Sequence, residues 1–527
     1  MSVMSEMGAL HKALLVICLL LAIVTNSESK RNVLLIFGDD AGFQMGAYNN
    51  TACKTPNFDK LAARSVVFKH GYTSVSSCSP SRSVLLTGLP QHQNGMYGLV
   101  HLPHHFSTMD SVKSLPVILD KAGIRTGIIG KKHVGPDTVY KFDYEQTEET
   151  HDPNQIGRNI TFMRNFVRHF LQQKDDRPFF LYLAFHDPHR CSNIPLYGQF
   201  CERFGNRQPG MGVIPDWTPA YYKPEDVEVP YFLPDTLTTR QDLANMYTTY
   251  SRMDQGIGLF LSELEAAGHM NDTLILYTAD NGIPFPGAKT NLYDPGMGEP
   301  MMISSPLHRE FWGTVSDALA STMDFTPTIL DWFGVNYPQY NMLGKKVKLT
   351  GKSLLPVTVN PDTTADNFTY VFSSHDLHEV TMYYPMRVLR TKTWKLIHNL
   401  NFEAPYPIAR DCYQAPSYLE IINKTMAGQK TGWFKDLEHY YYRDQWELFN
   451  TESDPMELHN LANASEYSDV FTNMRTTLLT WLNVTNDPWI CSPTGVLEGE
   501  TCMTLFNSRK PFGRQTSSNQ NLRPGSL

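Results

Sequence analysis

Four short apolar runs in the first half of the chain constrain its fold more than any other feature. They lie at residues 33–37, 126–129, 179–185 and 274–278. Their length and their β-branched and aromatic residues favour buried strands of a parallel sheet over short buried helices. Helical patterns lie between them, at residues 114–122 and 243–267, and each is followed by a glycine. Strands that alternate with helices predict an α/β layered domain.

A polar cluster follows each of these runs. The clusters are Gly38-Asp39-Asp40, Gly130-Lys131-Lys132-His133, His186-Asp187-Pro188-His189 and Ala279-Asp280-Asn281-Gly282. Ligands of open α/β sheets bind beyond the carboxyl ends of the strands. We therefore expect carboxylates, imidazoles and ammonium groups from the four clusters to share one cleft.

The chain of 527 residues is too long for a single core, because cores stop growing near about 250–300 residues. After about residue 370 the sequence changes to short polar and aromatic segments, at residues 394–397, 439–442 and 447–449. These predict a smaller antiparallel sheet, with a helix near residues 470–482. We expect an α/β domain at 30–370, an α+β domain at 371–507 and a flexible tail at 508–527.

The N-terminus has the layout of a secretory signal. An apolar run at residues 13–24 follows His11 and Lys12 and precedes a polar stretch, and about 12 apolar residues are too few to span a bilayer comfortably. We expect a signal peptide at residues 1–29 that is cleaved, rather than an uncleaved anchor. N-glycosylation is expected at seven N-x-Ser/Thr sequons, at Asn49, Asn159, Asn271, Asn367, Asn423, Asn463 and Asn483.

Cysteine spacing predicts two local disulfides. Cys191 and Cys201 are close enough in sequence to close a small loop, and so are Cys491 and Cys502. Cys53 and Cys412 either pair with each other or remain buried thiols, and Cys78 is left without a partner.

The charge of the chain bears on its partners. A net charge of -8 and a pI of about 6.1 lack the basic excess of a nucleic-acid-binding protein, so we expect no nucleic-acid partner. An anionic substrate stays possible, because a few Lys and Arg side chains focused in one cleft can hold sulfate or phosphate.

Cys78 stands just before an expected helix start. Ser79 is a candidate helix cap and Pro80 suits the first helical position, so the positive end of the helix would face Cys78 and favour anion chemistry there. The alternative is an ordinary thiol or disulfide cysteine in a capped turn.

The segment CSPSR at residues 78–82, continued by LLTG at 85–88, resembles the signature of the sulfatase family, in which this cysteine is converted to formylglycine. Residues 88–98, 185–191 and 379–387 further resemble its lysosomal members that remove N-linked sulfate from heparan. The resemblance implies the alkaline-phosphatase-like sulfatase fold. That fold has a large mixed, mostly parallel sheet flanked by helices, and a smaller antiparallel C-terminal domain.

The resemblance also assigns the metal site. Asp39, Asp40, Asp280 and Asn281 offer only oxygen ligands, which favour a hard cation such as Ca²⁺ over Zn²⁺. The family implies Ca²⁺ bound by these four residues and by the modified Cys78.

The family pattern places basic residues around this metal. Arg82 is expected to steady the nucleophile. The sulfate is assigned to Lys131, the formylglycine hydroxyl to His133, and the leaving group to His189. Lys289 falls where the N-sulfatase pattern carries Arg, which is the one departure at a site position. The remaining histidines, Lys132 and Arg190 are expected to be structural or solvated.

These parts imply one mechanism. A hydroxyl of hydrated formylglycine attacks sulfur, and the second hydroxyl later expels sulfate as the aldehyde re-forms, while His189 protonates the leaving nitrogen. The expected activity is exo-acting removal of the N-linked sulfate from a non-reducing terminal glucosamine of heparan sulfate, in the lysosome. The expected partners are a heparan sulfate oligosaccharide, the formylglycine-generating enzyme and a second copy of the chain in a homodimer, with no membrane anchor.

Two alternatives remain open at this point. An O-sulfatase of the same fold, acting on a glycosaminoglycan, would differ in its preference for a sulfamate or a 6-O-sulfate. A catalytically inactive secreted carbohydrate-binding glycoprotein would leave residue 78 unmodified.

Overall fold

The computed structural model describes residues 31–101, 103–151, 155–191, 196–363, 368–499 and 501–504. The expected signal peptide at 1–29 and tail at 508–527 lie outside the described residues, and the domain limits remain predictions. In the part of the chain that is described, we find no helix with the length and apolar character needed to cross a membrane.

An eight-stranded sheet forms the centre of the molecule, in the order β4-β3-β5-β1-β6-β7-β2-β8. Strand β7 is antiparallel to β6 and β2, and the other neighbouring pairs are parallel. The sheet is therefore mixed and mostly parallel, as predicted. Its strands are β1 (Asn32–Asp39), β2 (Val66–Tyr72), β3 (Arg125–Gly130), β4 (Tyr144–Thr147), β5 (Phe179–Pro188), β6 (Thr273–Ala279), β7 (Met301–Ser304) and β8 (Thr314–Ser321).

The four apolar runs are the adjacent strands β3, β5, β1 and β6. Every residue of these strands is buried, because helices cover both faces of the sheet. Val33 of β1 pairs with Phe180 of β5 and with Leu274 of β6. The carboxyl ends of the four strands consequently meet at one edge.

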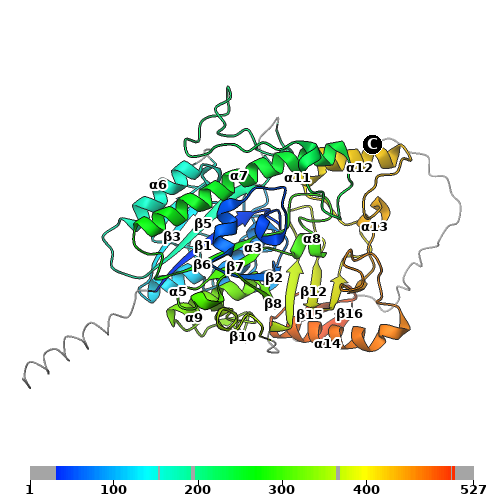
Figure 1. Cartoon of the computed structure of the whole chain (residues 1–527). Coiled ribbons are helices and arrows are strands. Elements are labelled where there is room, and N and C mark those ends of the chain that lie inside the picture. Colours follow the sequence, from blue (N-terminus) through cyan, green and yellow to red (C-terminus); the bar gives the residue numbers. More distant parts are fainter. Residues whose placement is uncertain are drawn as a thin grey trace, which may run out of the picture.

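Two hydrophobic layers enclose this sheet. Leu34 and Ile36 of β1 pack with residues of α2, α6 and α7, whereas Val33, Leu35 and Phe37 pack with residues of α3, α5 and α9. Figure 1 shows α6 and α7 along one side of the sheet and α5 and α9 along the other. The helices of this region are α2 (Pro56–Ala62), α3 (Cys78–Thr87), α4 (Gln91–Asn94), α5 (Leu115–Lys121), α6 (Ile160–Leu171), α7 (Leu237–Ala266), α8 (Asp294–Met297), α9 (Phe325–Phe333) and α10 (Leu355–Val359).

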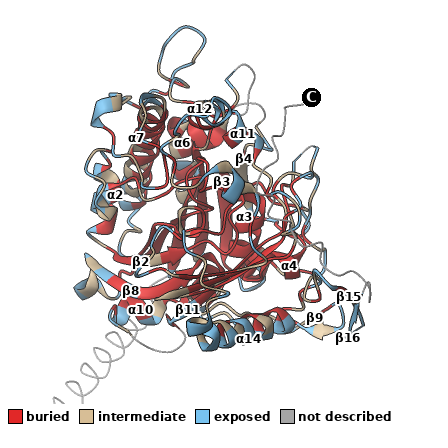
Figure 2. Ribbon diagram, turned by 90° about the vertical axis from the view of Figure 1, so that its right-hand side faces the viewer, coloured by how far each residue is buried: buried red, intermediate tan, exposed pale blue. Residues whose placement is uncertain are grey.

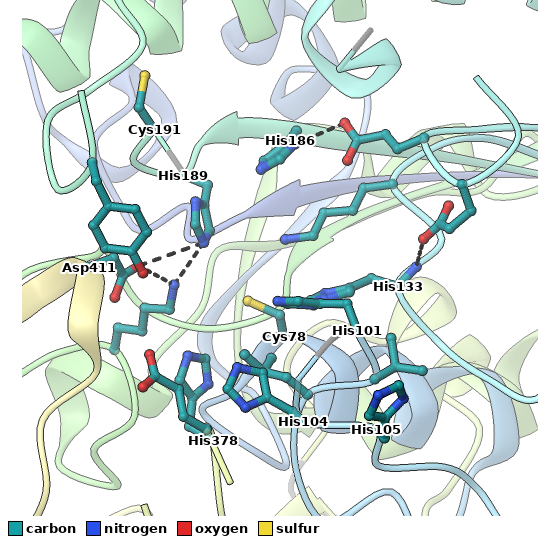
Figure 3. A pocket seen from close by; sticks show the side chains of 18 residues that line it. Cys78, His101, His104, His105, His133, His186, His189, Cys191, His378 and Asp411 are labelled. Atoms are coloured by element: carbon teal, nitrogen blue, oxygen red, sulfur yellow. Dashed lines mark hydrogen bonds and ion pairs between the residues drawn. The ribbon is translucent and has the colours of Figure 1, made fainter. Parts of the chain in front are cut away.

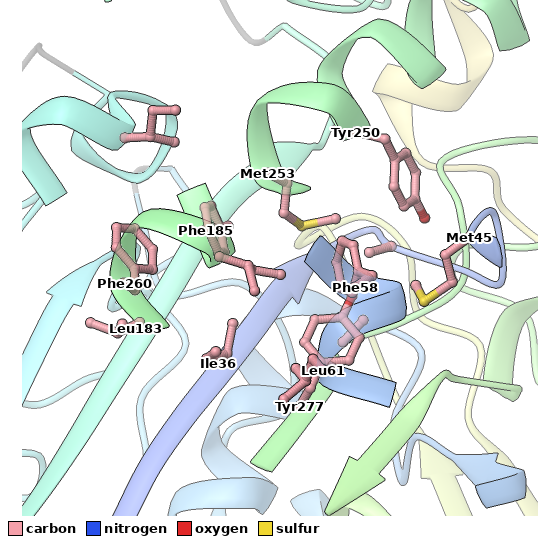
Figure 4. Packing of buried hydrophobic residues seen from close by; sticks show 14 of the residues in the cluster. Ile36, Met45, Phe58, Leu61, Leu183, Phe185, Tyr250, Met253, Phe260 and Tyr277 are labelled. Carbon is pink, nitrogen blue, oxygen red and sulfur yellow. The ribbon is translucent and has the colours of Figure 1, made fainter. Parts of the chain in front are cut away.

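Aromatic side chains fill the layer between the sheet and α7. Met253 and Phe260 of α7 lie near Phe185 of β5 in Figure 4, Tyr250 of α7 extends toward Met45, and all of them belong to one buried cluster with Tyr277 of β6. The rings of Phe185 and Phe260 stack at 5.5 Å. Because such rings bury large areas, this layer anchors the strands whose ends carry the polar clusters.

The C-terminal region contains a four-stranded antiparallel sheet, in the order β11-β12-β13-β14. Its strands are β11 (Tyr370–His375), β12 (Met386–Thr391), β13 (Trp394–Asn399) and β14 (Trp446–Asn450). Helix α14 (Ser468–Val484) covers it through a shared core that includes Leu448 and Leu478. Figure 2 shows the large sheet as the buried centre and an exposed outer face on α14.

The predicted strands at residues 394–397 and 447–449 and the predicted helix at 470–482 are therefore confirmed. The segment at 439–442 does not form a strand of this sheet, because most of it lies in helix α13 (Leu437–Tyr441). Asp436 caps this helix, since its side chain accepts a hydrogen bond from the amide of His439. The remaining elements are α11 (Arg410–Tyr413), α12 (Pro416–Met426), the hairpin β9 (Asn341–Met342) and β10 (Lys345–Lys346), and the hairpin β15 (Gly495–Glu498) and β16 (Thr501–Thr504).

Both predicted disulfides are present. Cys191 bonds to Cys201, and Cys491 bonds to Cys502. Of the two possibilities for the remaining pair, the structure shows buried free thiols at Cys53 and Cys412.

Candidate active site

Cys78 is the first residue of α3, so its side chain lies at the positive end of the helix dipole. It is a free, buried thiol, and its Sγ lies 3.9 Å from Asp40 Oδ1. Asp40 follows β1 directly. The helix start and the end of the central strand thus bring a nucleophile position next to a carboxylate.

The start of α3 differs from the prediction that Ser79 caps the helix and Pro80 is its first residue. The N-cap is Ser77, whose carbonyl oxygen accepts a hydrogen bond from the amide of Ser81 at 2.9 Å. Ser79 lies within the first turn, where its Oγ accepts from the amide of Val100 at 3.1 Å. Its hydroxyl therefore fixes a neighbouring loop instead of capping the helix.

The four oxygen-bearing residues predicted to bind a metal lie together, fully buried. Asp280 Oδ1 accepts from the amide of Asp40, and the Asn281 side chain donates to Asp40 Oδ1, both at 2.8 Å. Asn281 Oδ1 is buried and has no hydrogen-bond partner. A buried oxygen without a partner is costly unless it binds something further, so its position beside three carboxylates fits a cation ligand.

Three buried cations face these carboxylates. Arg82 Nη2 donates to Asp280 Oδ2 at 2.8 Å and to Asp39 at 3.1 Å, and Lys131 Nζ lies 2.5 Å from Asp39 Oδ2. Lys289 Nζ lies 2.8 Å from Asp40 Oδ2. The predicted basic residues and the predicted acidic residues therefore meet in one network.

The electrostatics of the carboxylates also favour a bound cation. Burial raises the pKa of Asp280 to about 8 and that of Asp40 to about 6, and the charge of Asp39 adds to both shifts. Burial alone would raise the pKa of Asp39 as well, but the charges of Lys131 and Arg82 hold it well below its ordinary value. A divalent ion would keep all three ionised, and a donor set made only of oxygen suits Ca²⁺.

Two of the predicted histidines are neutral in this arrangement. His189 accepts a hydrogen bond through Nε2 from Lys289 Nζ at 3.0 Å, while its Nδ1 donates to the carbonyl of Arg190 at 2.7 Å. His133 Nε2 lies 2.5 Å from His101 Nδ1. Burial and the nearby charges of Lys289 and Lys131 lower the pKa of His189 and of His133, respectively, well below its ordinary value.

These residues open into a pocket of about 770 Å³. Five predicted residues line it, namely Cys78, Lys131, His133, His189 and Lys289. Arg82 and the oxygen-bearing residues lie deeper. In Figure 3, His186 and His189 lie on one wall, and His101, His104 and His378 lie on the opposite wall.

Sequence analysis missed much of the pocket lining. The polar residues without a signal are His101, His104, His105, Glu148, Glu149, Tyr197, His378, Glu379 and Asp411, whereas His186 belongs to a strand-end cluster that was expected in the cleft. Five of the histidines expected to be structural or solvated thus line the pocket, three of them within residues 101–105, and that expectation stays a prediction. Lys132 is itself buried and forms ion pairs with the exposed Asp137 and the partly buried Glu145, whereas Arg190 forms a fully buried ion pair with Asp242.

A family model for sulfatases matches residues 31–335. The chain belongs to the sulfatase family. A second model, described as the C-terminal part of N-sulphoglucosamine sulphohydrolase, matches residues 288–423 and 411–483. The human N-sulphoglucosamine sulphohydrolase is 55% identical over 496 residues, which cover 93% of this chain and 98% of the human protein. As a member of this family, the chain is a sulfatase hydrolase.

More distant sulfatases align over most of the chain. The N-acetylglucosamine-6-O-sulfatase of Bacteroides thetaiotaomicron is 23% identical and covers 84% of each chain. Among solved structures, BT4656 in complex with its substrate D-glucosamine-2-N,6-O-disulfate superposes with a TM-score of 0.59 at 20% identity, over 87% of this chain and 98% of that one. The phosphonate monoester hydrolase of Agrobacterium radiobacter gives a TM-score of 0.58 at 18% identity, over 91% and 100%. These structures establish the fold.

Proposed function

We propose that this sulfatase removes the N-linked sulfate from the non-reducing terminal N-sulfoglucosamine of heparan sulfate. One observation carries the proposal: the region matched by the N-sulphoglucosamine sulphohydrolase C-terminal model supplies part of the pocket wall. Lys289, His378, Glu379 and Asp411 all lie within that matched region and line the pocket. Of these residues, His378, Glu379 and Asp411 lie beyond the general sulfatase match at 31–335, so the part of the pocket wall that they form belongs to the N-sulphoglucosamine sulphohydrolase match alone.

Residue 78 is the proposed nucleophile position, after oxidation of Cys78 to formylglycine. Hydrated formylglycine at this position would supply one hydroxyl for attack on sulfur and a second hydroxyl for the release of sulfate, and Ca²⁺ held by the neighbouring carboxylates would supply positive charge for the sulfate oxygens. The position at the start of α3 supports this role, because the helix dipole stabilises negative charge there.

The proposed calcium ligands are Asp39, Asp40, Asp280, Asn281 and residue 78. Their burial, their oxygen atoms and the unpartnered Asn281 Oδ1 support the assignment. Arg82 keeps Asp39 and Asp280 in place through its guanidinium.

Lys131 and Lys289 are the proposed sulfate-binding groups. Both ammonium groups line the pocket and form ion pairs with carboxylates that are proposed calcium ligands. Binding of calcium to these carboxylates would free the two ammonium groups to donate hydrogen bonds to an anion. His133 would hold the hydroxyl of residue 78, and its backbone amide donates a hydrogen bond to Glu149 Oε1 that supports its position.

His189 is the proposed proton donor to the leaving nitrogen. Because Lys289 now donates to His189 Nε2, the imidazole becomes an acid only when a negative charge enters beside it and raises its pKa. The anionic sulfamate supplies that charge, and an acidic lysosomal pH would supply the proton.

The proposal includes the route of maturation. A cleaved signal peptide would admit the chain to the secretory pathway, where the formylglycine-generating enzyme modifies Cys78, N-glycans are added and the protein is sorted to the lysosome as a homodimer. The buried disulfide-bonded Cys191 and the disulfide Cys491–Cys502 agree with an oxidising compartment.

A matched pair of substrates tests the function. A terminal N-sulfated glucosamine should be turned over with a kcat/KM far above that of the 6-O-sulfated N-acetyl counterpart. The reverse preference would identify an O-sulfatase. Turnover of neither substrate by protein whose Cys78 is unmodified would point to a binding glycoprotein without catalysis.

A further inference from the structure

One wall of the pocket carries an imidazole to which sequence analysis gave no role. His186 lies near the end of β5, nine-tenths buried, and its Nε2 lies 3.8 Å from Asp39 Oδ2, while its hydrogen bond to a described residue is made by Nδ1. Asp39, His186 and His189 offer three ligand atoms within 4.8 Å of one another. This group contains two nitrogens, unlike the oxygen-only calcium site.

The outer hydrogen bonds orient both imidazoles for metal binding. His186 Nδ1 donates to Glu148 Oε1 at 2.9 Å, and His189 Nδ1 donates to the carbonyl of Arg190 at 2.7 Å. A carboxylate oxygen and a carbonyl oxygen can only accept a hydrogen bond. Each Nδ1 therefore carries the hydrogen of its imidazole, and each Nε2 presents a lone pair. A carboxylate or carbonyl behind the distal nitrogen is the usual support of a metal-bound histidine.

Asp39 can serve this group without leaving the calcium site. Its Oδ1 faces Arg82 at 3.1 Å, whereas its Oδ2 faces Lys131 and His186. The two oxygens of one carboxylate therefore point to two neighbouring sites. Two imidazoles and one carboxylate with an open side toward the pocket suit Zn²⁺ or a similar borderline ion.

We propose that Asp39, His186 and His189 form a second metal site that binds Zn²⁺ beside the calcium site and thereby inhibits the enzyme. The ammonium groups of Lys131 and Lys289 now occupy Asp39 Oδ2 and His189 Nε2. Zinc could bind these two atoms only if the lysine contacts broke. Zinc binding therefore displaces the two lysine side chains that the proposed function assigns to sulfate. Inhibition rests on that function, but zinc binding does not.

Zinc titration of the mature, calcium-loaded enzyme at neutral pH tests the site. The protein should be fully converted at Cys78, so that no thiol at this position can bind the ion. With Ca²⁺ in excess, elemental analysis after dialysis should find one Zn²⁺ per chain and no loss of calcium. Co²⁺ should occupy the same site and give the visible absorption of a nitrogen-ligated, low-coordinate ion.

Two variants and one control locate the ion. His186→Asn should abolish zinc binding, and Glu148→Gln should weaken it by about 10- to 100-fold, because it removes only the outer support. His105→Asn, in the same pocket but outside the group, should bind zinc as the native enzyme does. Melting temperature and calcium content verify that each variant is folded. If His186→Asn does not fold, the zinc affinity of Glu148→Gln tests the site instead.

Several results would overturn the proposal. They are absence of zinc binding by the native enzyme, release of one calcium for each zinc bound, and zinc affinity unchanged in both His186→Asn and Glu148→Gln. Zinc should also inhibit turnover in competition with the substrate. Inhibition that added substrate cannot relieve would refute the overlap between the zinc site and the sulfate-binding lysines. If the enzyme proved inactive on N-sulfated substrate but still bound zinc as described, the proposed function would fail while the zinc site would stand.

Discussion

Lys289 Nζ lies 2.8 Å from Asp411 Oδ2. Lys289 follows β6 of the large sheet, and Asp411 lies in the first turn of α11 in the C-terminal region. Both side chains are buried, and Lys289 also contacts Asp40 at 2.8 Å. The C-terminal region thus holds a proposed sulfate-binding lysine of the catalytic sheet in place.

Asp411→Asn should lower kcat/KM by about 10- to 100-fold, because breaking a buried ion pair leaves Lys289 partly uncompensated and drawn toward Asp40. Steady-state kinetics on the N-sulfated substrate measure this effect. Lys289→Arg is the matched control and should keep most of the activity, since it keeps the positive charge between the two carboxylates. Native kinetics in Asp411→Asn would show that the contact is dispensable.

Chelation of the proposed calcium ion, or Asp280→Ala, should abolish turnover while the protein stays folded, because Asp280 is one of the proposed oxygen ligands. Calcium added to the chelated native enzyme should restore activity, but Asp280→Ala should not respond. Asp272→Asn serves as the control, because Asp272 directly precedes the first residue of β6 and Asp280 directly follows the last one. Full activity in protein shown by elemental analysis to lack metal would disprove the calcium assignment.

The peptide that contains Cys78 should be lighter by about 18 Da in active protein from secretory cells, since conversion to formylglycine exchanges sulfur for oxygen and removes two hydrogens. Mass spectrometry measures the loss, and the peptide should react with hydrazides. The buried thiol Cys412 should remain alkylatable after denaturation in the same digest. Cys78→Ser should fold but lack turnover, and fully active material with an unmodified thiol would refute the mechanism.

The side chain of Asp254 should stabilise the folded protein more at pH 5 than at pH 7. Burial raises the pKa of Asp254 in α7 to about 6, above the value expected in the unfolded chain. The folded state therefore binds this proton more tightly, and its stabilisation, on the order of 2 kcal/mol, is present below about pH 4 and is lost as the pH rises through 6.

Asp254→Asn should reduce this difference, because the neutral amide can still accept from the amides of Asn57 and Phe58. Calorimetry at the two pH values measures it. An Asp254→Asn variant whose melting temperature changes between pH 5 and pH 7 by as much as that of the native protein would contradict the assignment.

Local sequence predicted the centre of this protein because its signals act over short distances. Apolar runs such as residues 179–185 and 274–278 identified buried strands, and residues that follow their carboxyl ends must meet at one edge of a parallel sheet. The positions of Asp39, Lys131, His189 and Asp280 at that edge follow from this rule and the order of residues alone.

Other features depended on contacts between distant segments. The strand β7 reverses direction inside an otherwise parallel sheet, and neither its length nor its composition indicates that reversal. The hydroxyl of Ser79 looked like a helix cap, but the approach of Val100 gave it another partner. At such positions a hydrogen bond to a distant segment replaces the local capping bond that the side chain would otherwise make.

The sequence by itself determined the α/β layering, the two local disulfides and the residues at the four strand ends. Only the tertiary structure decided that His186 turns its free nitrogen toward Asp39 and that Asp411, 122 residues beyond Lys289, completes the same site. The physical reason is that strand ends are positioned by regular hydrogen bonding, which local sequence specifies. Loop and C-terminal side chains are positioned by packing between segments that no local pattern records.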